Sequence, residues 1–491
     1  MTDPSAQPPA PIDPRHVDGL LLRGIAWTGG AKWVVQLLSW VSLVVLARLL
    51  TPSDFGLVGL AGLYLGFIGM VTEAGLGTAI LSLPDLDRSK IAQLNSVALI
   101  FGLLGTVATA AGSIPFGHFF RSPELPLVMV ALSITFLLSA LRTVPTALLQ
   151  KELRFRDLGL IESVQGLIAM VASVGLAFAG LGYWSLVWSN VGATAIGTVI
   201  LFLVRPHGFA VPRAGPLRGA LGFSGRVLVS RMSWYVYSNA DFAVAGRMLG
   251  TATLGLYKQA WEIASVPVDK ISALVTRVTP AFVARLQDDP AALRRTVLRI
   301  TEGLLLITLP ASIGMALVAD HFVPVALGPQ WTDAALPLAL LSIFTSFRSI
   351  VTILPQILTV RGETRMLMWN GIVTAVVLPV AFWIGSHWGA AGIAAAWIVG
   401  YPWSTVQLYR RTSRTLELGA REYLAAVWPA VRGTAAMAVA VIATRLLLPP
   451  SVALGVRLGV EVAVGAVVYL VAGVVPQRER FKRLVDLVRG R

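Results

Sequence analysis

The sequence contains no cysteine and lacks the common signatures of an enzyme. Without cysteine among its 491 residues, the chain can form no disulfide bond, thiolate nucleophile or cysteine metal site. No glycine is followed directly by lysine, which excludes the phosphate-binding loop of Walker-type ATPases. The 5 histidines are far apart and lack the spacing of zinc ligands. We therefore expect no metal, no cofactor and no catalytic residues.

Charged residues are also scarce. They make up only 13% of the chain, whereas 56% of the residues are hydrophobic and the mean hydropathy is +0.74. This balance is far from that of a water-soluble domain. A bilayer core of about 30 Å requires about 20 mostly apolar residues per helix, because only a helix satisfies its own backbone hydrogen bonds there. The composition predicts an all-α polytopic membrane protein.

Apolar runs of the required length recur along the sequence. They predict about fourteen transmembrane helices. The approximate spans are 25–49, 55–82, 91–113, 124–149, 157–179, 182–204, 219–245, 253–283, 296–319, 333–359, 366–385, 389–409, 424–447 and 452–475. No loop between them is long enough to form an extramembrane domain.

The net charge of +15 is distributed in a way that indicates membrane orientation. Basic residues occur in short clusters between apolar runs, such as Arg410, Arg411 and Arg414, rather than along one soluble face. We therefore expect no nucleic-acid partner. Clusters of this kind favour the cytoplasmic side, and here they fall at every second turn. This alternation predicts that both termini are cytoplasmic.

Two segments near the ends of predicted helices resemble each other. In "ARLLTPSDFGLVGL" and "AGRMLGTATLGLYK", Arg48 and Arg247 each precede a Gly-Leu pair, which begins at Gly56 and Gly255. The shift between the two arginines is 199 residues (247 − 48). Duplicated bundles are common among transporters, so this similarity suggests an internal repeat. The alternative is chance similarity between apolar sequences.

A second pair of segments supports the repeat. The segments "LRTVPTALLQ" and "FRSIVTILPQ" align Arg142 with Arg348 at a shift of 206 residues (348 − 142). Two six-helix lobes would share one orientation, with an axis along the membrane normal. The predicted organisation is a disordered cytoplasmic tail (1–23), an N-lobe of helices 1–6 (24–204), a cytoplasmic linker (205–218), a C-lobe of helices 7–12 (219–409), helices 13–14 (424–475) and a basic cytoplasmic tail (476–491).

Several sequence segments resemble a known protein family. The opening "GIAWTGGAKWVVQLLSWVSLVVLARLLTPSDFGLVGL" and the later "EAGLGTAIL", "LLQKELRFRDL" and "GLGYWSLVW" resemble polysaccharide biosynthesis proteins of the Wzx type. They resemble especially the colanic-acid-exporter-like branch, within the multidrug/oligosaccharidyl-lipid/polysaccharide exporter superfamily. The resemblance is densest over about residues 20–210, and "ARLLTPSDFG" is its most specific part.

The resemblance implies a flippase of the bacterial inner membrane. Its substrate would be an undecaprenyl-pyrophosphate-linked oligosaccharide for surface or exopolysaccharide biosynthesis. Transport would proceed by ion-coupled alternating access between two lobes. Besides this lipid-linked oligosaccharide and the membrane lipids, the expected partners are a polysaccharide polymerase and a chain-length regulator.

Ionisable residues inside the predicted spans are the candidates for a transport site. A charge at a helix centre costs about 2.5–3.5 kcal/mol, so such residues line a wet cavity, form pairs or extend to the interface. Arginine suits pyrophosphate because its planar fork donates two parallel hydrogen bonds. Helical spacing places several of these residues on shared faces. The cavity candidates are Lys32, Gln36, Arg142, Arg226, Arg231, Tyr237, Asp241, Lys258, Glu262 and Arg348.

Two embedded carboxylates are candidates for coupling to an ion gradient. Glu73 and Glu162 lie inside apolar spans, where a carboxylate can bind a proton or a sodium ion. A carboxylate can equally neutralise a neighbouring arginine. For all these charges, the alternative to a transport role is a set of structural ion pairs that hold helices together.

Other functions remain open at the level of sequence. A multidrug/cation antiporter of the same superfamily would have an aromatic and acidic pocket, whereas basic residues outnumber acidic ones inside these spans. A peptidoglycan-precursor flippase is another relative. A membrane polysaccharide polymerase or ligase typically carries a sizeable periplasmic loop, and the sequence shows none.

Overall fold

The computed structural model describes most of the chain, and the described part is helical. It covers residues 36, 38–73, 80, 87–152, 154–212, 232, 234–286 and 289–475, and these contain no strand. Within them, 10 helical stretches are long and apolar enough to cross a membrane, and Leu38–Leu49 forms a shorter apolar helix. The expectation of an all-α polytopic membrane protein is confirmed. The predicted tails, 1–23 and 476–491, lie outside the described residues.

The helices form two compact units. The first comprises residues 1–46, 72–106 and 134–224, and the second comprises 47–71, 107–133 and 225–491. These units do not follow the predicted lobe boundaries, because parts of the expected N-lobe group with the second unit. The division into six, six and two helices therefore stays a prediction.

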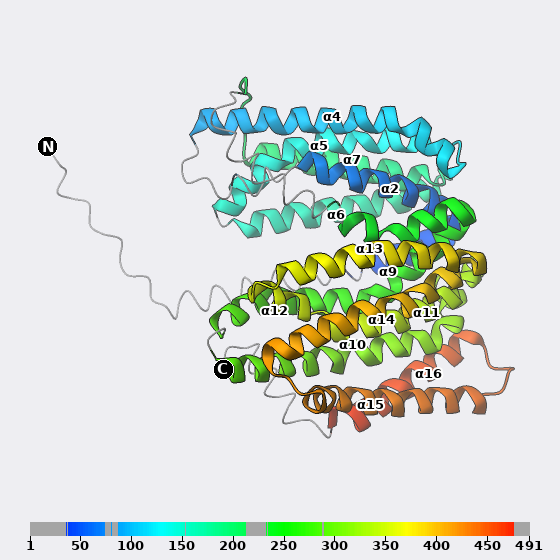
Figure 1. Ribbon diagram of the computed structural model, residues 1–491. Coiled ribbons are helices and arrows are strands. Elements are labelled where there is room, and N and C mark those ends of the chain that lie inside the picture. The colour runs from blue at the N-terminus through cyan, green and yellow to red at the C-terminus, as the bar shows by residue number, and fades with distance from the viewer. Residues whose placement is uncertain are drawn as a thin grey trace, which may run out of the picture. The chain divides into compact units, whose positions relative to one another are not determined.

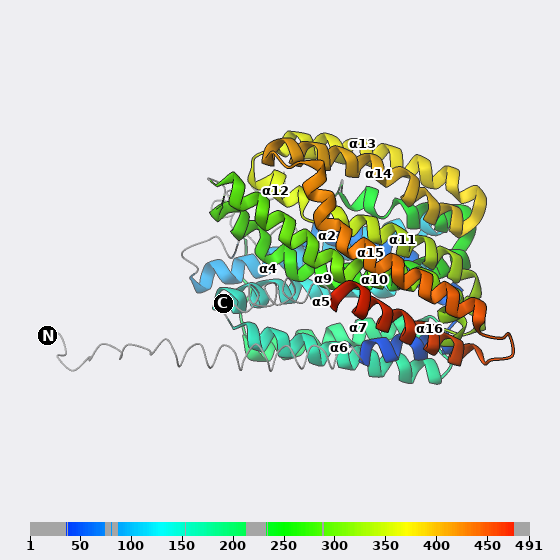
Figure 2. The same cartoon turned by 90° about the horizontal axis from the view of Figure 1, so that it is seen from below.

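The described part of the first unit contains four long helices, wholly or in part. It contains the first part of α4 (Arg88–Phe120), the second part of α5 (Leu125–Lys151), and all of α6 (Phe155–Phe178) and α7 (Trp184–Val204). Helices α6 and α7 lie side by side in Figures 1 and 2. The turn between them contains Gly180 and Gly182, both with positive φ, a conformation that favours glycine.

Close packing in the first unit depends on small residues. A Cβ atom on Gly102 of α4 would lie 2.6 Å from the Cβ of Ala140 and 2.8 Å from the Phe136 carbonyl oxygen, both in α5. Glycine therefore lets the two helices approach closely, as is common in membrane bundles. Leu94 of α4 and Val144 of α5 are buried in the same apolar cluster.

The second unit holds most of the remaining helices. They are α2 (Pro52–Glu73), α9 (Ala240–Arg285), α10 (Pro290–Ala326), η1 (Pro329–Ala334), α11 (Ala335–Val351), α12 (Leu354–Val360), α13 (Thr364–Gly385), η2 (Ser386–Trp388), α14 (Gly389–Leu416), α15 (Ala420–Leu447), α16 (Leu454–Tyr469) and the π-helical turn η3 (Leu470–Val474). One apolar core gathers residues of α9, α10, α11, α12, α14 and α15. Helices α15 and α16 pack against α10 (Figures 1 and 2).

The predicted spans agree with the described helices. Each of the fourteen overlaps helical residues, although the first and seventh are described only in their later parts. Helix α9 contains two segments, because Gly250 interrupts it with φ 86° and ψ 177°. This break lies between the predicted spans 219–245 and 253–283. The total of fourteen helices and the cytoplasmic position of both termini stay predictions.

The two Gly-Leu pairs of the predicted repeat meet in the second unit. A Cβ atom on Gly56 of α2 would lie 1.8 Å from the Thr251 carbonyl oxygen, and one on Gly255 of α9 would lie 1.8 Å from the Pro52 carbonyl oxygen. The contacts are reciprocal at the shift of 199 residues seen in the sequence (251 − 52 and 255 − 56). Reciprocal contacts are expected where a twofold axis relates two equivalent surfaces. The crossing supports the repeat interpretation.

Candidate functional site

A polar stripe follows one face of α9. Lys258, Glu262 and Asp269 are spaced by four and seven residues, which places them on the same side of the helix. The Lys258 ammonium lies 3.7 Å from the Glu262 carboxylate, which confirms the pairing expected at this spacing. The lysine stem also packs over α2, because a Cβ on Gly59 would lie 3.1 Å from Lys258 Cδ.

Arg348 of α11 joins this stripe through an ion pair. Its Nη2 atom lies 2.5 Å from Asp269 Oδ1, and its guanidinium carbon lies 6.0 Å from the centre of the Trp261 ring. The arginine side chain is 25% exposed and the aspartate side chain 60% exposed. A charge that is mostly buried needs such a partner, because desolvation otherwise makes it costly. The pair leaves part of both groups accessible to a ligand.

Asp241 lies at the start of α9 and is fully buried. Its carboxylate accepts hydrogen bonds from the Tyr257 hydroxyl (2.9 Å), the Trp397 indole N–H (3.1 Å) and the Phe242 backbone N–H (2.9 Å). No basic side chain of the described residues pairs with it. Its hydrogen bonds link the beginning of α9 to its second segment and to α14.

Aromatic rings enclose this carboxylate. The Trp397 and Phe344 rings stack with their centres 4.7 Å apart, and the Trp261 ring centre is 5.3 Å from that of Trp397. Tyr237, one turn before Asp241, is half-buried. Asp241 therefore acts in this structure as a buried anchor among aromatic side chains and does not line an open surface.

The first unit contains a separate polar cluster. Arg142 of α5 donates a hydrogen bond of 2.6 Å to the Gln165 amide oxygen of α6, and the Gln165 amide nitrogen lies 3.5 Å from the Thr194 hydroxyl of α7. Gly197 leaves room for this contact, since a Cβ there would be 2.7 Å from the Gln165 oxygen. Glu162, one turn before Gln165, is exposed.

The structure thus brings together only some of the predicted site residues. Lys258, Glu262 and Arg348 share one region of the second unit, whereas Arg142 lies in the first unit. Gln36 is helical and half-buried. Candidates outside the described residues are Lys32, Arg226 and Arg231, and of Glu73 only the backbone, at the end of α2, is described.

Several contributing residues escaped the sequence-based prediction. Gln165 and Trp397 contact predicted candidates from other helices, and Tyr257 contacts Asp241 from the second segment of α9. A glutamine inside an apolar span was the one available signal, because uncharged polar residues there usually bond to a neighbouring helix. For Tyr257 and Trp397, helical periodicity carries no information on which partner they meet.

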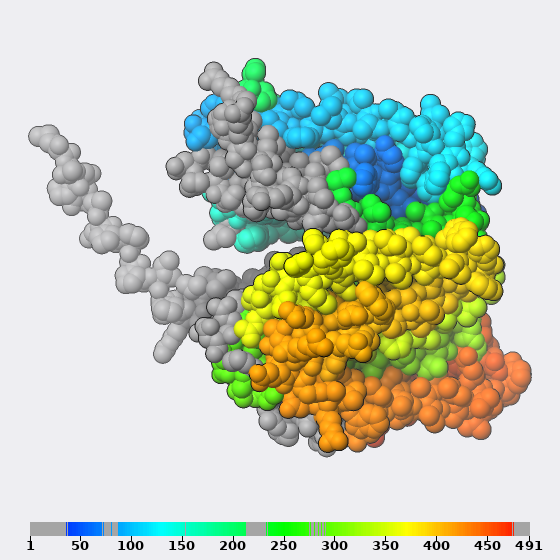
Figure 3. Space-filling model, viewed as in Figure 1, coloured from blue at the N-terminus to red at the C-terminus, as the bar shows by residue number. Residues whose placement is uncertain are grey.

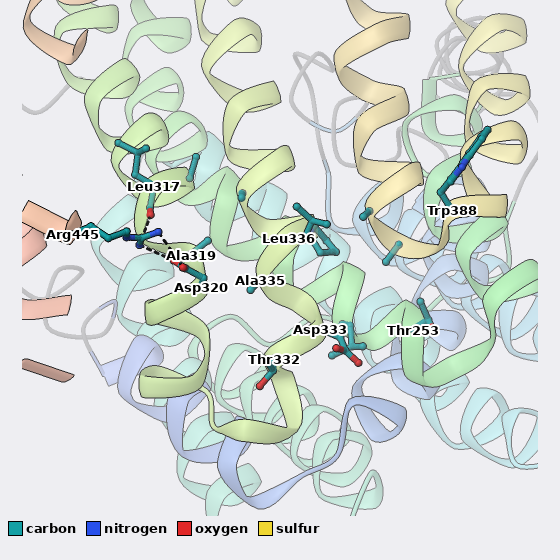
Figure 4. A pocket seen from close by; sticks show the side chains of 16 residues that line it. Thr253, Leu317, Ala319, Asp320, Thr332, Asp333, Ala335, Leu336, Trp388 and Arg445 are labelled. Atoms are coloured by element: carbon teal, nitrogen blue, oxygen red, sulfur yellow. Dashed lines mark hydrogen bonds and ion pairs between the residues drawn. The ribbon is translucent and has the colours of Figure 1, made fainter. Parts of the chain in front are cut away.

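A pocket of about 590 Å³ opens between α9, α10, α11 and α14 of the second unit (Figure 4). Its polar lining includes Asp320, Arg445, Asp333, Thr332 and Thr253. Figure 4 shows Arg445 directed toward Asp320 and the Leu317 carbonyl, which it reaches at 2.8 Å and 2.9 Å.

Behind this pocket, a charge network fastens the last two helices to α10. Arg445 of α15 also contacts Glu461 of α16 at 3.3 Å, and the fully buried Glu461 lies 3.0 Å from His321 Nδ1 of α10. The arginine partners the exposed Asp320 and the buried Glu461, and it stabilises the buried charge of Glu461. These residues hold helices together, and the lining of the pocket carries one arginine and two aspartates.

The chain is similar to several proteins of polysaccharide biosynthesis. It is 26% identical to "Lipopolysaccharide biosynthesis protein WzxC" of Escherichia coli K12, over 83% of this chain and 84% of that protein. It is 24% identical to "Teichuronic acid biosynthesis protein TuaB" of Bacillus subtilis 168, covering 92% and 94%. It is also 24% identical to "Succinoglycan biosynthesis transport protein ExoT" of Rhizobium meliloti 1021, covering 96% of each.

Solved structures with the same fold are transporters. A structure titled "Lipid II flippase MurJ, inward closed conformation" matches with a TM-score of 0.71 and 11% identity, over 92% of this chain and 99% of that chain. An inward-facing multidrug transporter of the MATE family matches with a TM-score of 0.59 and 17% identity, over 79% and 96%. At these identities the likeness shows the fold alone, which is that of a multi-pass membrane transporter.

A family model described as "Polysaccharide biosynthesis protein" matches residues 45–336, which is more than half of the chain. The match begins just before the "ARLLTPSDFG" segment and continues to the start of α11. It confirms the resemblance found in the sequence. The chain belongs to the polysaccharide biosynthesis protein family.

Proposed function

We propose that the chain is a flippase for lipid-linked oligosaccharides in the bacterial inner membrane. The observation that carries this proposal is similarity over nearly the whole length to relatives named for lipopolysaccharide, teichuronic acid and succinoglycan biosynthesis. The fold supports it, because the same arrangement of helices occurs in a lipid II flippase. The product would serve surface or exopolysaccharide biosynthesis, and the protein would act as a transporter rather than an enzyme.

The polar stripe of α9 suits a head group that carries phosphate and sugar. Lys258 and Arg348 supply positive charge, while Glu262 and Asp269 accept hydrogen bonds from hydroxyl groups. Each basic group is already paired with a carboxylate, so a bound pyrophosphate would replace that carboxylate as the anionic partner. Such an exchange allows binding and release without leaving a bare charge in the membrane. The prenyl chain would remain in the lipid.

Ion coupling remains part of the proposal. Glu162 is exposed on α6 and lies one turn from the Arg142–Gln165 pair, so its charge state can influence that arginine. Glu73 is retained from the sequence alone. A polymerase and a chain-length regulator are proposed partners, because flipped units must be joined on the other side of the membrane.

One observation favours a second candidate, a multidrug antiporter. The fold matches a MATE transporter, and Asp241 with its aromatic neighbours has the acidic and aromatic character expected for a cationic drug site. Against it, Asp241 has no exposed surface and already accepts three hydrogen bonds. The polysaccharide relatives also cover more of the chain than the MATE structure does.

Deletion of the gene tests the proposed function. We expect the deletion strain to lose its surface polysaccharide and to accumulate the lipid-linked oligosaccharide on the cytoplasmic side, both restored by the intact gene. The lipid extract is measured by mass spectrometry after labelling of exposed head groups. Normal polysaccharide without an accumulated intermediate, in a strain with no second flippase gene, would contradict the proposal. Sensitivity to cationic drugs instead would favour the antiporter.

A further inference from the structure

A second pocket lies between α13 and α14, and no residue of the charged stripe of α9 lines it. Figure 3 shows these helices, in yellow and orange, on the surface of the second unit. The pocket has a volume of about 500 Å³, within the range of small-ligand sites. The residues that give it chemical character are Arg365, Arg411, Trp369, Trp403, Asn370 and Gln407.

The charge of the pocket is positive. Arg411 Nη2 lies 2.5 Å from Glu363 Oε1, so these two charges cancel. Arg365 is exposed, and no acidic group in the described ranges pairs with it. It lies in the first turn of α13, where no side chain caps the backbone N–H groups. An uncapped helix start next to an unpaired arginine attracts an anion such as phosphate.

The uncharged lining is of the kind that binds sugars. Trp369 and Trp403 are 54% and 44% exposed, so each offers part of its ring to a ligand. The Asn370 amide donates to the Ser404 hydroxyl at 2.8 Å, while its buried carbonyl oxygen accepts no hydrogen bond. Gln407 is half-buried one turn from Trp403. Rings that pack against C–H groups, together with amides that bond to hydroxyls, recognise a sugar.

The charge pattern near the pocket indicates its depth in the membrane. Arg365 and Arg411 line the pocket, and Arg361 and Arg410 lie close to them in the sequence. Such clusters favour the cytoplasmic surface. Tryptophan residues are enriched at the same interface, where lipid head groups lie. The exposed face of α13 toward its other end is apolar, with Val376 and Val380 on it. A lipid with its head in the pocket could therefore rest its chain along this face.

We propose that this pocket docks the sugar-diphosphate head of the lipid substrate at the cytoplasmic surface before transport. The inference rests on the proposed flippase function and adds a loading site to it. Arg365 binds the diphosphate, the Gln407 amide binds sugar hydroxyls, and the tryptophans pack against the sugar ring. No residue of the charged stripe on α9 takes part.

The test uses the full chain in nanodiscs of phosphatidylcholine. The probe is a short polyprenyl diphosphate that carries one glucose with a photoreactive diazirine, and labelled peptides are identified by mass spectrometry. We expect labelling of peptides that contain Trp369 and Trp403. Arg365→Gln should require about tenfold more probe for half-maximal labelling, since a hydrogen bond to a charged group is lost. Gln407→Ala should weaken labelling in the same direction.

Arg410→Gln is the matched control. Arg410 is exposed beside Arg411 but does not line the pocket, so labelling should equal that of the wild type. Competition distinguishes the sources of phosphate: the unlabelled glucosyl lipid should displace the probe, whereas equal concentrations of phosphatidylglycerol or inorganic pyrophosphate should not. Displacement by either would overturn the assignment to a sugar-diphosphate lipid.

A parallel flipping assay with the same probe separates failure of the pocket from failure of the function. If the wild type flips the probe but the α13 and α14 peptides remain unlabelled, or if Arg365→Gln labels like the wild type, the loading site is wrong and the flippase stands. If the wild type neither flips nor binds the probe, both proposals are wrong.

Discussion

Asp241 illustrates why a polar residue in a predicted span is difficult to assign from sequence. Its position on helix 7 allowed either a cavity or an interior contact, and helical spacing cannot decide between them. The structure buries it against Tyr257 and Trp397, which lie on other segments. Its role as a substrate ligand stays a prediction, whereas its role as a hydrogen-bond acceptor is visible.

Replacing Asp241 by asparagine should destabilise the protein. Asparagine has one acceptor oxygen, so either the Phe242 N–H or the Tyr257 hydroxyl loses its acceptor. A buried unsatisfied donor costs about 1–3 kcal/mol, and we expect a lower thermal unfolding midpoint in detergent. Tyr237→Phe is the control, because the Tyr237 hydroxyl makes no hydrogen bond within the described structure. An unchanged midpoint for Asp241→Asn would contradict this account.

The pairs in the polar stripe differ in how far sequence could predict them. Lys258 and Glu262 pair along one helix, so their spacing was sufficient. Arg348 and Asp269 lie on different helices, and only the packing of α11 against α9 shows that they meet. The spacing of residues along the sequence predicts pairs within one helix, but it does not show which residues of two different helices meet.

The Arg348–Asp269 pair gives a test of the transport role. Arg348→Gln should reduce oligosaccharide export by about tenfold, because a charge-assisted hydrogen bond to phosphate is worth about 1.5 kcal/mol or more. Asp269→Asn should reduce it less, and the double variant should equal Arg348→Gln. Export is measured as extracted surface polysaccharide at equal protein levels. If the double variant recovers wild-type export, the pair is structural and Arg348 does not bind substrate.

At the scale of helices, hydropathy predicted the elements well. The predicted span 124–149 corresponds to α5 (Leu125–Lys151), and 366–385 corresponds to α13 (Thr364–Gly385). Lipid requires long apolar runs, and the sequence shows them directly. The interruption at Gly250 falls between two predicted spans. The grouping of helices into compact units depends on packing, so it was not predictable from the sequence.

The crossing of α2 and α9 is the clearest element that links sequence to structure. The sequence identified the two glycine pairs as a repeat but did not show that they touch. With the Ser53 and Thr251 hydroxyls 3.1 Å apart, cysteines at these positions should form a crosslink in a chain that has no native cysteine. The crosslink therefore reports on this crossing alone.

Gly255→Ala should open the crossing. The added Cβ would lie 1.8 Å from the Pro52 carbonyl oxygen, so the two backbones must separate. Overpacking of this kind lowers the free energy of unfolding by about 1–3 kcal/mol. In the S53C/T251C background we expect crosslinking to fall several-fold, and Gly56→Ala should act equally because the contact is reciprocal. Gly62→Ala is the control, since nothing lies within 4 Å of its Cβ position. Undiminished crosslinking in Gly255→Ala would show that the helices do not cross so closely.

At the scale of the whole molecule, composition and charge were sufficient to predict the class of protein. The high hydrophobic content predicted a helical membrane bundle, and the "ARLLTPSDFG" segment indicated the family that the comparisons confirm. The substrate path was not predictable in the same way. Its residues come from several helices, and Lys32, Arg226 and Arg231 lie outside the described part.

Movement of a lipid-linked oligosaccharide by the purified chain is the most direct test of the central claim. The full protein is reconstituted into liposomes that contain a fluorescent polyprenyl diphosphate oligosaccharide, and an impermeant reagent quenches the head groups on the outer leaflet. With protein and an imposed ion gradient, we predict that the quenchable fraction rises well above that of protein-free liposomes. An equal fraction with and without protein, under proton and sodium gradients of either direction, would contradict the account.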